Sequence, residues 1–285
     1  MGRRENIRKD RASERDGTRT RGFRVIRPLV SREDVAEHNR DYGHQVQYKA
    51  MDRPEFDEYA ASYEELLADP IRDRFGGGSV FFQERKRDLI RAYCRRHGMP
   101  TRSMRYLDVG CGRGDLLTLL RDDFATVAGC DPSAEMLGGT EKVEMRVQSD
   151  VGRIPYEDGE FDFVTAVCVY HHVPIVERLS LSREVNRVMK PGGVFAIIEH
   201  NPYNPITQVI VSRTPVDANA VLLKRRECSE ILQQAGFSSQ EFQYFLFLPE
   251  FIYRRAGDSL ERGISKLPLG GQYAVFAIKR NSSIQ

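Results

Sequence analysis

Short apolar runs alternate with segments of helix-spaced apolar residues over the central and C-terminal parts of this chain. A run of about four to eight apolar residues is typical of a buried strand, whereas apolar residues at every third or fourth position indicate an amphipathic helix. These patterns predict strands at 104–109, 125–130, 142–147, 161–168, 194–199, 241–248 and 270–279. They predict helices at 114–122, 176–189 and 226–236. Strands that alternate with helices in this way favour a mostly parallel, doubly wound α/β sheet.

Helical spacing is also found ahead of the sheet. It predicts an amphipathic helix from Glu55, with an apolar face of Phe56, Tyr59, Ala60, Tyr63, Leu66 and Leu67. The glycines at 76–78 break this pattern, and a second helix is predicted from Phe81 to Arg96, ending near Gly98. We expect the Lys and Arg of this second helix to form a solvated face.

Charge is distributed unevenly along the chain. Residues 1–27 hold ten Arg and Lys against four Asp and Glu, so this stretch carries +6 and the remainder −4, giving +2 in total. Because apolar residues are few, we expect residues 1–35 to form a disordered basic tail and residues 36–102 a helical N-terminal segment. A basic tail could contact RNA, DNA or an anionic membrane. Aromatic residues for base stacking are scarce in it, which favours a solvated leader.

Composition is that of an ordinary globular protein, with 40% hydrophobic and 29% charged residues. No apolar run approaches the length of a membrane span, and the arginine-rich N-terminus has no apolar signal core. The five cysteines form no Cys-x-x-Cys pair, so we expect reduced thiols in a cytoplasmic setting and no zinc or other metal.

The glycine-rich stretch Asp108-Val-Gly-Cys-Gly-Arg-Gly114 lies between a predicted strand and a predicted helix. Glycines permit backbone angles that side chains forbid, and they let a ligand lie against the main chain. The spacing fits neither the dinucleotide-binding fingerprint nor a phosphate-binding P-loop. A carboxylate ahead of the turn would repel a pyrophosphate but suits a ligand that carries an ammonium and a sulfonium.

This stretch resembles motif I of the class I, seven-stranded S-adenosylmethionine-dependent methyltransferases. The resemblance covers about residues 103–280 and implies S-adenosylmethionine as cofactor. It also implies strand order 3-2-1-4-5-7-6, with the last strand antiparallel and cap insertions at about 201–224 and 249–269. The phrase Phe-Asp-Glu-Tyr-Ala-Ala-Ser-Tyr at 56–63 resembles the lid of many small-molecule methyltransferases.

Candidate cofactor residues follow the predicted strands in order. Asp131 ends the second strand, where a carboxylate is placed to accept both ribose hydroxyls, although it could instead cap a helix. The resemblance assigns Met136, Asp150 and Val151 to the adenine, with core packing an equal alternative for Met136. The full candidate set is Asp108, Gly110, Gly112, Gly114, Asp131, Pro132, Met136, Asp150, Val151 and Cys168.

Candidate acceptor-side residues follow the fourth and fifth strands. His171 and His172 lie where the transferred methyl group should point, and either could remove a proton from an oxygen acceptor or could simply orient a loop. The candidate substrate contacts are Tyr59, Tyr63, Glu199, His200, Asn201 and Tyr203. For these residues, core packing or turn formation is the alternative.

The sequence therefore predicts an S-adenosylmethionine-dependent methyltransferase that acts on a small molecule such as a sugar, a lipid-linked compound or a secondary metabolite. The end of the fourth strand lacks the Asn/Asp-Pro-Pro-Tyr/Phe motif of DNA and protein-amide N-methyltransferases, which makes that acceptor class less favoured. No pattern of a metal-dependent catechol type is evident. Two alternatives stay open: an RNA methyltransferase that uses the basic tail, and a cofactor-binding partner protein without catalysis. The oligomeric state is left open.

Overall fold

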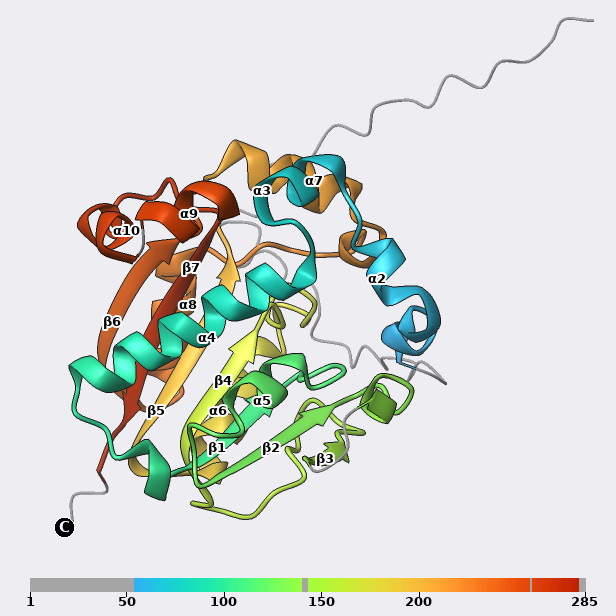
Figure 1. Cartoon of the computed structure of the whole chain (residues 1–285). Helices are drawn as coiled ribbons and strands as arrows, with labels where there is room; N and C mark the ends of the chain where they lie inside the picture. The colour runs from blue at the N-terminus through green and yellow to red at the C-terminus, as the bar shows by residue number, and fades with distance from the viewer. Residues whose placement is uncertain (1–53, 140–142, 257, 282–285) are drawn as a thin grey trace, which may run out of the picture. The chain divides into compact units, whose positions relative to one another are not determined.

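The computed structural model describes residues 54–139, 143–256 and 258–281 (Figure 1). The predicted basic tail and the first part of the predicted N-terminal segment lie outside these residues. Within the described residues no helix has both the length and the apolar character needed to cross a membrane.

A seven-stranded sheet forms the centre of the structure, in the order β3-β2-β1-β4-β5-β7-β6. Its strands are β1 Arg105–Val109, β2 Thr126–Asp131, β3 Glu144–Val147, β4 Phe161–Val167, β5 Met189–His200, β6 Phe237–Phe245 and β7 Gln272–Lys279. The pairs among β1 to β5 are parallel, and β7 is antiparallel to both β5 and β6. The predicted fold class and strand order are confirmed.

Helices cover both faces of the sheet (Figure 1). On one face α4 Ser79–Arg96 and α5 Asp115–Leu120 pack together, and Ile90 and Leu117 are fully buried there. On the other face α6 Arg178–Val188 and α8 Arg225–Gln234 bury Leu181 and Leu232. Apolar helix residues spaced by three and four therefore meet apolar strand residues on both sides of the sheet.

Short helices make up the remaining described segments. These are η1 Glu55–Asp57, η2 Ala60–Ser62, α2 Tyr63–Leu66, α3 Pro70–Gly76, η3 Thr101–Ser103, η4 Met136–Gly139, α7 Pro205–Arg213, η5 Pro215–Asp217, α9 Glu250–Ala256 and α10 Asp258–Ile264. The last four lie within the two predicted insertions. In Figure 1, α9, α10, α3 and α7 gather near the carboxyl end of β5.

The predicted continuous helix from Glu55 is wrong. Two 3-10 turns and a single α-turn replace it, because tertiary hydrogen bonds shape this segment: the Arg113 guanidinium donates to the carbonyl of Ala60, and the Ser133 hydroxyl donates to Asp57 at 2.5 Å. Helix α3 was not predicted. It begins at Pro70 after Asp69, whose carboxylate accepts from the two following free amides.

The predicted boundaries of the last strands also differ from the structure. Strand β5 begins at Met189 rather than Val194, and Lys190–Gly193 form a bulge within it, since Phe161 pairs with Met189 and Phe163 with Val194. Strand β6 ends at Phe245, although the apolar run continues to Leu248. Beyond the strand, Leu246 is buried without strand pairing, and Phe247 and Leu248 are half-buried.

The expected solvated basic face of α4 is wrong at two positions. Arg85 and Lys86 are 3% and 6% exposed. The Arg85 guanidinium pairs with Glu261 of α10 and lies 3.5 Å from the ring centre of Tyr253 of α9. These contacts join α4 to the second insertion.

Candidate functional site

The glycine turn after β1 has the backbone conformation that its sequence predicts. Gly110, Gly112 and Gly114 have φ values of 71°, 51° and 78°, in the left-handed region that favours glycine. A Cβ on Gly110 would lie 2.4 Å from a methyl carbon of Val169. The turn thus lets the ends of β1 and β4 approach each other closely.

Asp131, at the end of β2, is tied to this turn. One carboxylate oxygen accepts from the Gly112 amide at 2.8 Å, and the other accepts from the Ser133 amide at 2.9 Å. Burial raises the pKa of Asp131, and these two hydrogen bonds oppose the shift. Each oxygen keeps a further lone pair for a ligand. The amide of Met136, at the start of η4, is met by the Ser133 hydroxyl rather than by Asp131.

Asp108 lies deeper, within β1, and is 3% exposed. Its carboxylate accepts from the Thr165 hydroxyl at 2.6 Å. Burial raises the pKa of Asp108 to about 7, against the opposing effects of the Thr165 hydrogen bond and the nearby Lys86 ammonium. Sequence reasoning missed Lys86. Its four-residue spacing from Phe82 and Ile90 on α4 could have indicated that it faces the sheet.

The segment from η1 to α2 covers the site and carries the aromatic residues of the predicted lid. The Phe56 ring lies 5.8 Å from Tyr59 and 6.5 Å from Tyr63. Phe56 also packs edge-on against His172, with 5.0 Å between ring centres. Burial raises the pKa of Tyr63, and the negative charges of Asp217 and Asp131 raise it further. The structure thus brings the lid together with the histidines.

The two candidate bases differ in their surroundings. His171 is 2% exposed, and its Nδ1 lies 2.5 Å from a carboxylate oxygen of Glu199. Its Nε2 lies 3.4 Å from Asp217, and so does Nε2 of His172, whose side chain is 18% exposed. Burial favours neutral imidazoles, but Glu199 and Asp217 together raise the pKa of His171 to about 10. Burial lowers the pKa of His172. Sequence reasoning missed Asp217, since its distance along the chain gave no signal.

Four other candidates near the histidines have different environments. Glu199 is fully buried and also accepts from the Val169 and Tyr170 amides at 3.0 and 2.7 Å. His200 lies 5.1 Å from His171 between ring centres, and burial lowers its pKa to about 4. Asn201 is buried and donates to the carbonyls of Pro268 and Gly270, whereas Tyr203 is 52% exposed.

The remaining cofactor candidates lie on both sides of the glycine turn. Met136 is buried, and its methyl carbon would be 3.4 Å from a Cβ added to Gly112. Cys168 has a φ of 58° and accepts a 3.4 Å contact from the Gln272 amide. The three other candidates are Pro132 and Asp150, both exposed, and Val151, which is half-buried.

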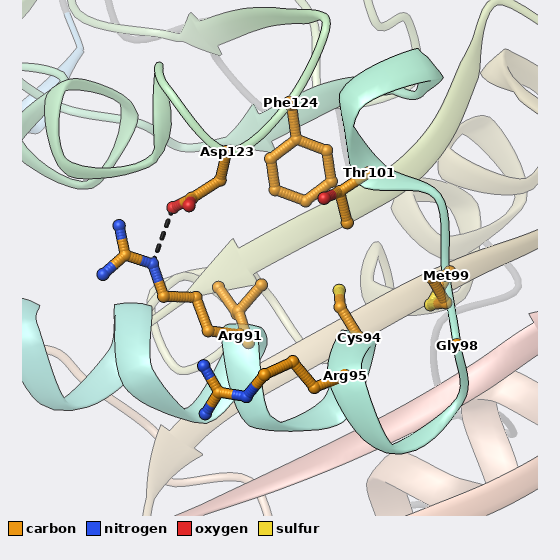
Figure 2. A pocket seen from close by; sticks show the side chains of 9 residues that line it. Arg91, Cys94, Arg95, Gly98, Met99, Thr101, Asp123 and Phe124 are labelled. Carbon is orange, nitrogen blue, oxygen red and sulfur yellow. Dashed lines mark hydrogen bonds and ion pairs between the residues drawn. The ribbon is translucent and has the colours of Figure 1, made fainter.

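A cavity of about 400 Å³ lies elsewhere, between the C-terminal half of α4 and the connection from α5 to β2 (Figure 2). Arg91, Arg95 and Phe124 are among its lining residues, and Arg91 donates to Asp123 at 2.7 Å. The cavity contains none of the candidate site residues.

A doubly wound sheet with a glycine turn after β1 and a buried carboxylate ending β2 defines a protein that binds a nucleoside-containing cofactor. Residues 107–197 match the family model of a methyltransferase domain. An uncharacterized methyltransferase of Synechocystis is 32% identical over 141 residues, which are 46% of this chain and 66% of that protein. The demethylmenaquinone methyltransferase of Staphylococcus aureus is 30% identical over 187 residues, which are 59% of this chain and 76% of that protein.

A solved structure shares the fold. The S-adenosylmethionine-dependent methyltransferase of Archaeoglobus fulgidus has a TM-score of 0.53 at 22% identity, covering 73% of this chain and 97% of that chain. The present chain belongs to the class I S-adenosylmethionine-dependent methyltransferases. The described residues fit that cofactor, because the glycine turn presents no side chains at Gly110, Gly112 and Gly114 and Asp131 keeps acceptor positions for hydroxyl groups.

Proposed function

We propose that this enzyme methylates a small-molecule acceptor (a sugar, a lipid-linked compound or a secondary metabolite) by in-line displacement. The observation that supports this proposal is the convergence of the lid, the glycine turn and the histidines. Phe56 contacts His172, Arg113 of the turn donates to Ala60 of the lid, and Ser133 beside Asp131 donates to Asp57. Such a covered site suits a compact acceptor better than a long polymer.

We assign the cofactor-side roles as follows. Asp108 and the glycine turn hold the methionine end of the cofactor. The buried Lys86 ammonium is a counter-charge for the carboxylate of the methionine moiety. Asp131 accepts from the ribose hydroxyls, and Met136, Asp150 and Val151 meet the adenine. When bound, S-adenosylmethionine supplies an electrophilic methyl group on its sulfonium. Holding the acceptor in line with that group supplies much of the rate enhancement.

We assign the acceptor-side roles from exposure and contacts. His172, the more exposed histidine, meets the acceptor beneath Phe56. His171 is a positioning residue, because its ring is held between Glu199 and Asp217. Tyr59 and Tyr63 form the lid wall, and Tyr203, half exposed at the end of β5, extends the acceptor surface.

Two measurements test this function. Calorimetric titration of S-adenosylmethionine into the full chain should show micromolar binding, and Asp131→Ala should weaken it at least about tenfold, or 1.4 kcal/mol. Asp122→Ala is the matched control, since this carboxylate is 86% exposed and lies on the α5–β2 connection. A panel of phenolic, sugar and amine acceptors should then yield S-adenosylhomocysteine with at least one class.

Intact cofactor binding without turnover on any acceptor would contradict the enzymatic proposal and favour a cofactor-binding partner protein. Turnover confined to RNA, with strong salt dependence that is lost on deleting residues 1–27, would favour the RNA methyltransferase.

A further inference from the structure

Three metal-binding side chains meet beside the lid. His171 and His172 follow β4, and Asp217 ends η5 in the first insertion, more than forty residues along the chain. Nε2 of each histidine and a carboxylate oxygen of Asp217 all lie within 4.8 Å of one another. The fold therefore gathers two imidazoles and one carboxylate at one point.

The distances from Asp217 to the two histidines match those between ligands of one metal ion and are long for hydrogen bonds. Each histidine Nε2 lies 3.4 Å from the same Asp217 oxygen. Good N–H···O hydrogen bonds are about 2.7–3.2 Å long. Donors that bind a zinc-class ion at about 2.0–2.1 Å in tetrahedral geometry lie about 3.3–3.4 Å from one another.

The surroundings of His171 add a second, independent observation. Its Nδ1 lies 2.5 Å from Glu199, and that carboxylate is itself held by the Val169 and Tyr170 amides. Histidines that bind metals commonly present their other ring nitrogen to a carboxylate, which fixes the ring orientation and strengthens the ligand. Here Glu199 directs Nε2 of His171 toward Asp217.

The cluster is largely buried and is least buried at His172. The side chain of His171 is 1% exposed, while those of Asp217 and His172 are 9% and 18% exposed. Phe56 of the lid packs against His172. Three protein ligands with a remaining open position are typical of catalytic rather than purely structural metal sites.

We propose that His171, His172 and Asp217 bind a divalent transition-metal ion of the zinc class, with Glu199 as the orienting carboxylate. Two nitrogen ligands favour this class over Mg²⁺ or Ca²⁺, which prefer oxygen. The cysteine pattern led us to expect no metal. That expectation does not apply to this site, because none of its ligands is a cysteine. With the ion bound, His172 is a ligand, and the open position beside it meets the acceptor.

The test uses the full untagged chain after dialysis against a chelator. Titration with Co²⁺ should give visible absorption bands of a low-symmetry four- or five-coordinate site that saturate at one equivalent, and Zn²⁺ should abolish them. His172→Ala and Asp217→Asn should each weaken Co²⁺ binding at least a hundredfold. Glu199→Gln should weaken it by roughly ten- to a hundredfold. His97→Ala is the matched control, since this exposed histidine pairs with Glu241 away from the site, and it should leave binding unchanged.

Circular dichroism and S-adenosylmethionine binding show which variants remain folded. Absence of saturable Co²⁺ absorption in the wild-type chain would overturn the proposal, whatever the folding of the variants. An intense near-ultraviolet sulfur-to-cobalt band, or binding that survives in folded Asp217→Asn, would also overturn it. Because none of these readouts needs an acceptor, a failure here is distinguishable from a failure of the proposed methyl transfer.

Discussion

Burial at the carboxyl end of β1 changes the acid–base behaviour of a single residue, Asp108. Its pKa rises from 3.8 to about 7, chiefly because burial disfavours the charged form. The folded-state pKa lies above the unfolded one, so the favourable contribution of this group to stability is largest below about pH 4 and is lost as pH rises through 7.

We predict that Asp108→Asn changes the pH dependence of stability in the cofactor-free protein. As the pH is raised from 4 to 8, the free energy of unfolding of the variant relative to wild type should increase by up to about 4 kcal/mol. The affinity of the variant for the cofactor at pH 8 should be lower than that of wild type. Urea titrations across this pH range measure the shift. Asp122→Asn, at an exposed carboxylate, serves as control. A difference from wild type that does not vary with pH would contradict the assignment.

Gly110 meets two structural demands, and Gly98 shares only the first of them. Both have positive φ values, 71° and 59°, but only at Gly110 would a Cβ meet another atom, a Val169 methyl carbon at 2.4 Å. We predict that Gly110→Ala reduces cofactor affinity at least tenfold, because the ends of β1 and β4 must separate. Gly98→Ala should lower stability by only about 1 kcal/mol and leave affinity unchanged. Calorimetry on both variants distinguishes these outcomes, and equal affinities would show that the turn tolerates the displacement.

At the scale of elements, a buried ion pair joins α4 to α10. Arg85 and Glu261 have side chains that are each 4% exposed, and the other Glu261 oxygen accepts from the Phe247 and Leu248 amides at 2.9 and 3.0 Å. The carboxylate thereby connects the segment that follows β6 to α10 of the second insertion. Removing Glu261 would leave the buried Arg85 guanidinium without this counter-charge, and breaking a buried ion pair in this way costs more free energy than the intact pair contributes.

We predict that Glu261→Ala lowers the free energy of unfolding by about 3–5 kcal/mol. Glu230→Ala, at a carboxylate that pairs with Arg226 on the exposed face of α8, should leave the urea midpoint almost unchanged. A loss of similar size in both variants would show that burial of the Arg85 pair adds nothing.

The sequence predicted the type of element correctly where the spacing of apolar residues matches the spacing of buried positions. This holds for the strands and for α4, α5, α6 and α8. Strong apolar spacing failed at 56–67, because the Arg113 and Ser133 hydrogen bonds outweigh local helical propensity. The basic residues of α4 were misplaced for a related reason: the partners of Arg85 come from an insertion more than 150 residues later. Local patterns carry no information on such contacts.

At the scale of the whole molecule, the sequence predicted which residues lie at the carboxyl ends of the strands better than it predicted contacts between loops. Asp108 and Asp131 lie near the carboxyl ends of β1 and β2, the glycine turn follows β1, and parallel strands bring their carboxyl ends together. Asp217 comes from a short helix in an insertion, and no spacing rule linked it to His171. Position along a sheet is therefore readable from the sequence, whereas the partner of a loop residue is not.

The lid connects the cofactor side of the site with the acceptor side. It contacts the glycine turn through Arg113 and the histidines through Phe56. We predict that cofactor binding slows hydrogen exchange of the amides of residues 60–66. In Arg113→Ala the protection of these amides should be roughly tenfold smaller, because the contact to the Ala60 carbonyl is lost. Arg121→Ala is the matched control, as this exposed arginine follows the same helix α5. Hydrogen-exchange mass spectrometry with and without S-adenosylhomocysteine measures the effect. Equal protection in the two variants would mean that Phe56 and its aromatic neighbours hold the lid in place without Arg113. The lid would then be coupled to the site through His172 and not through the glycine turn.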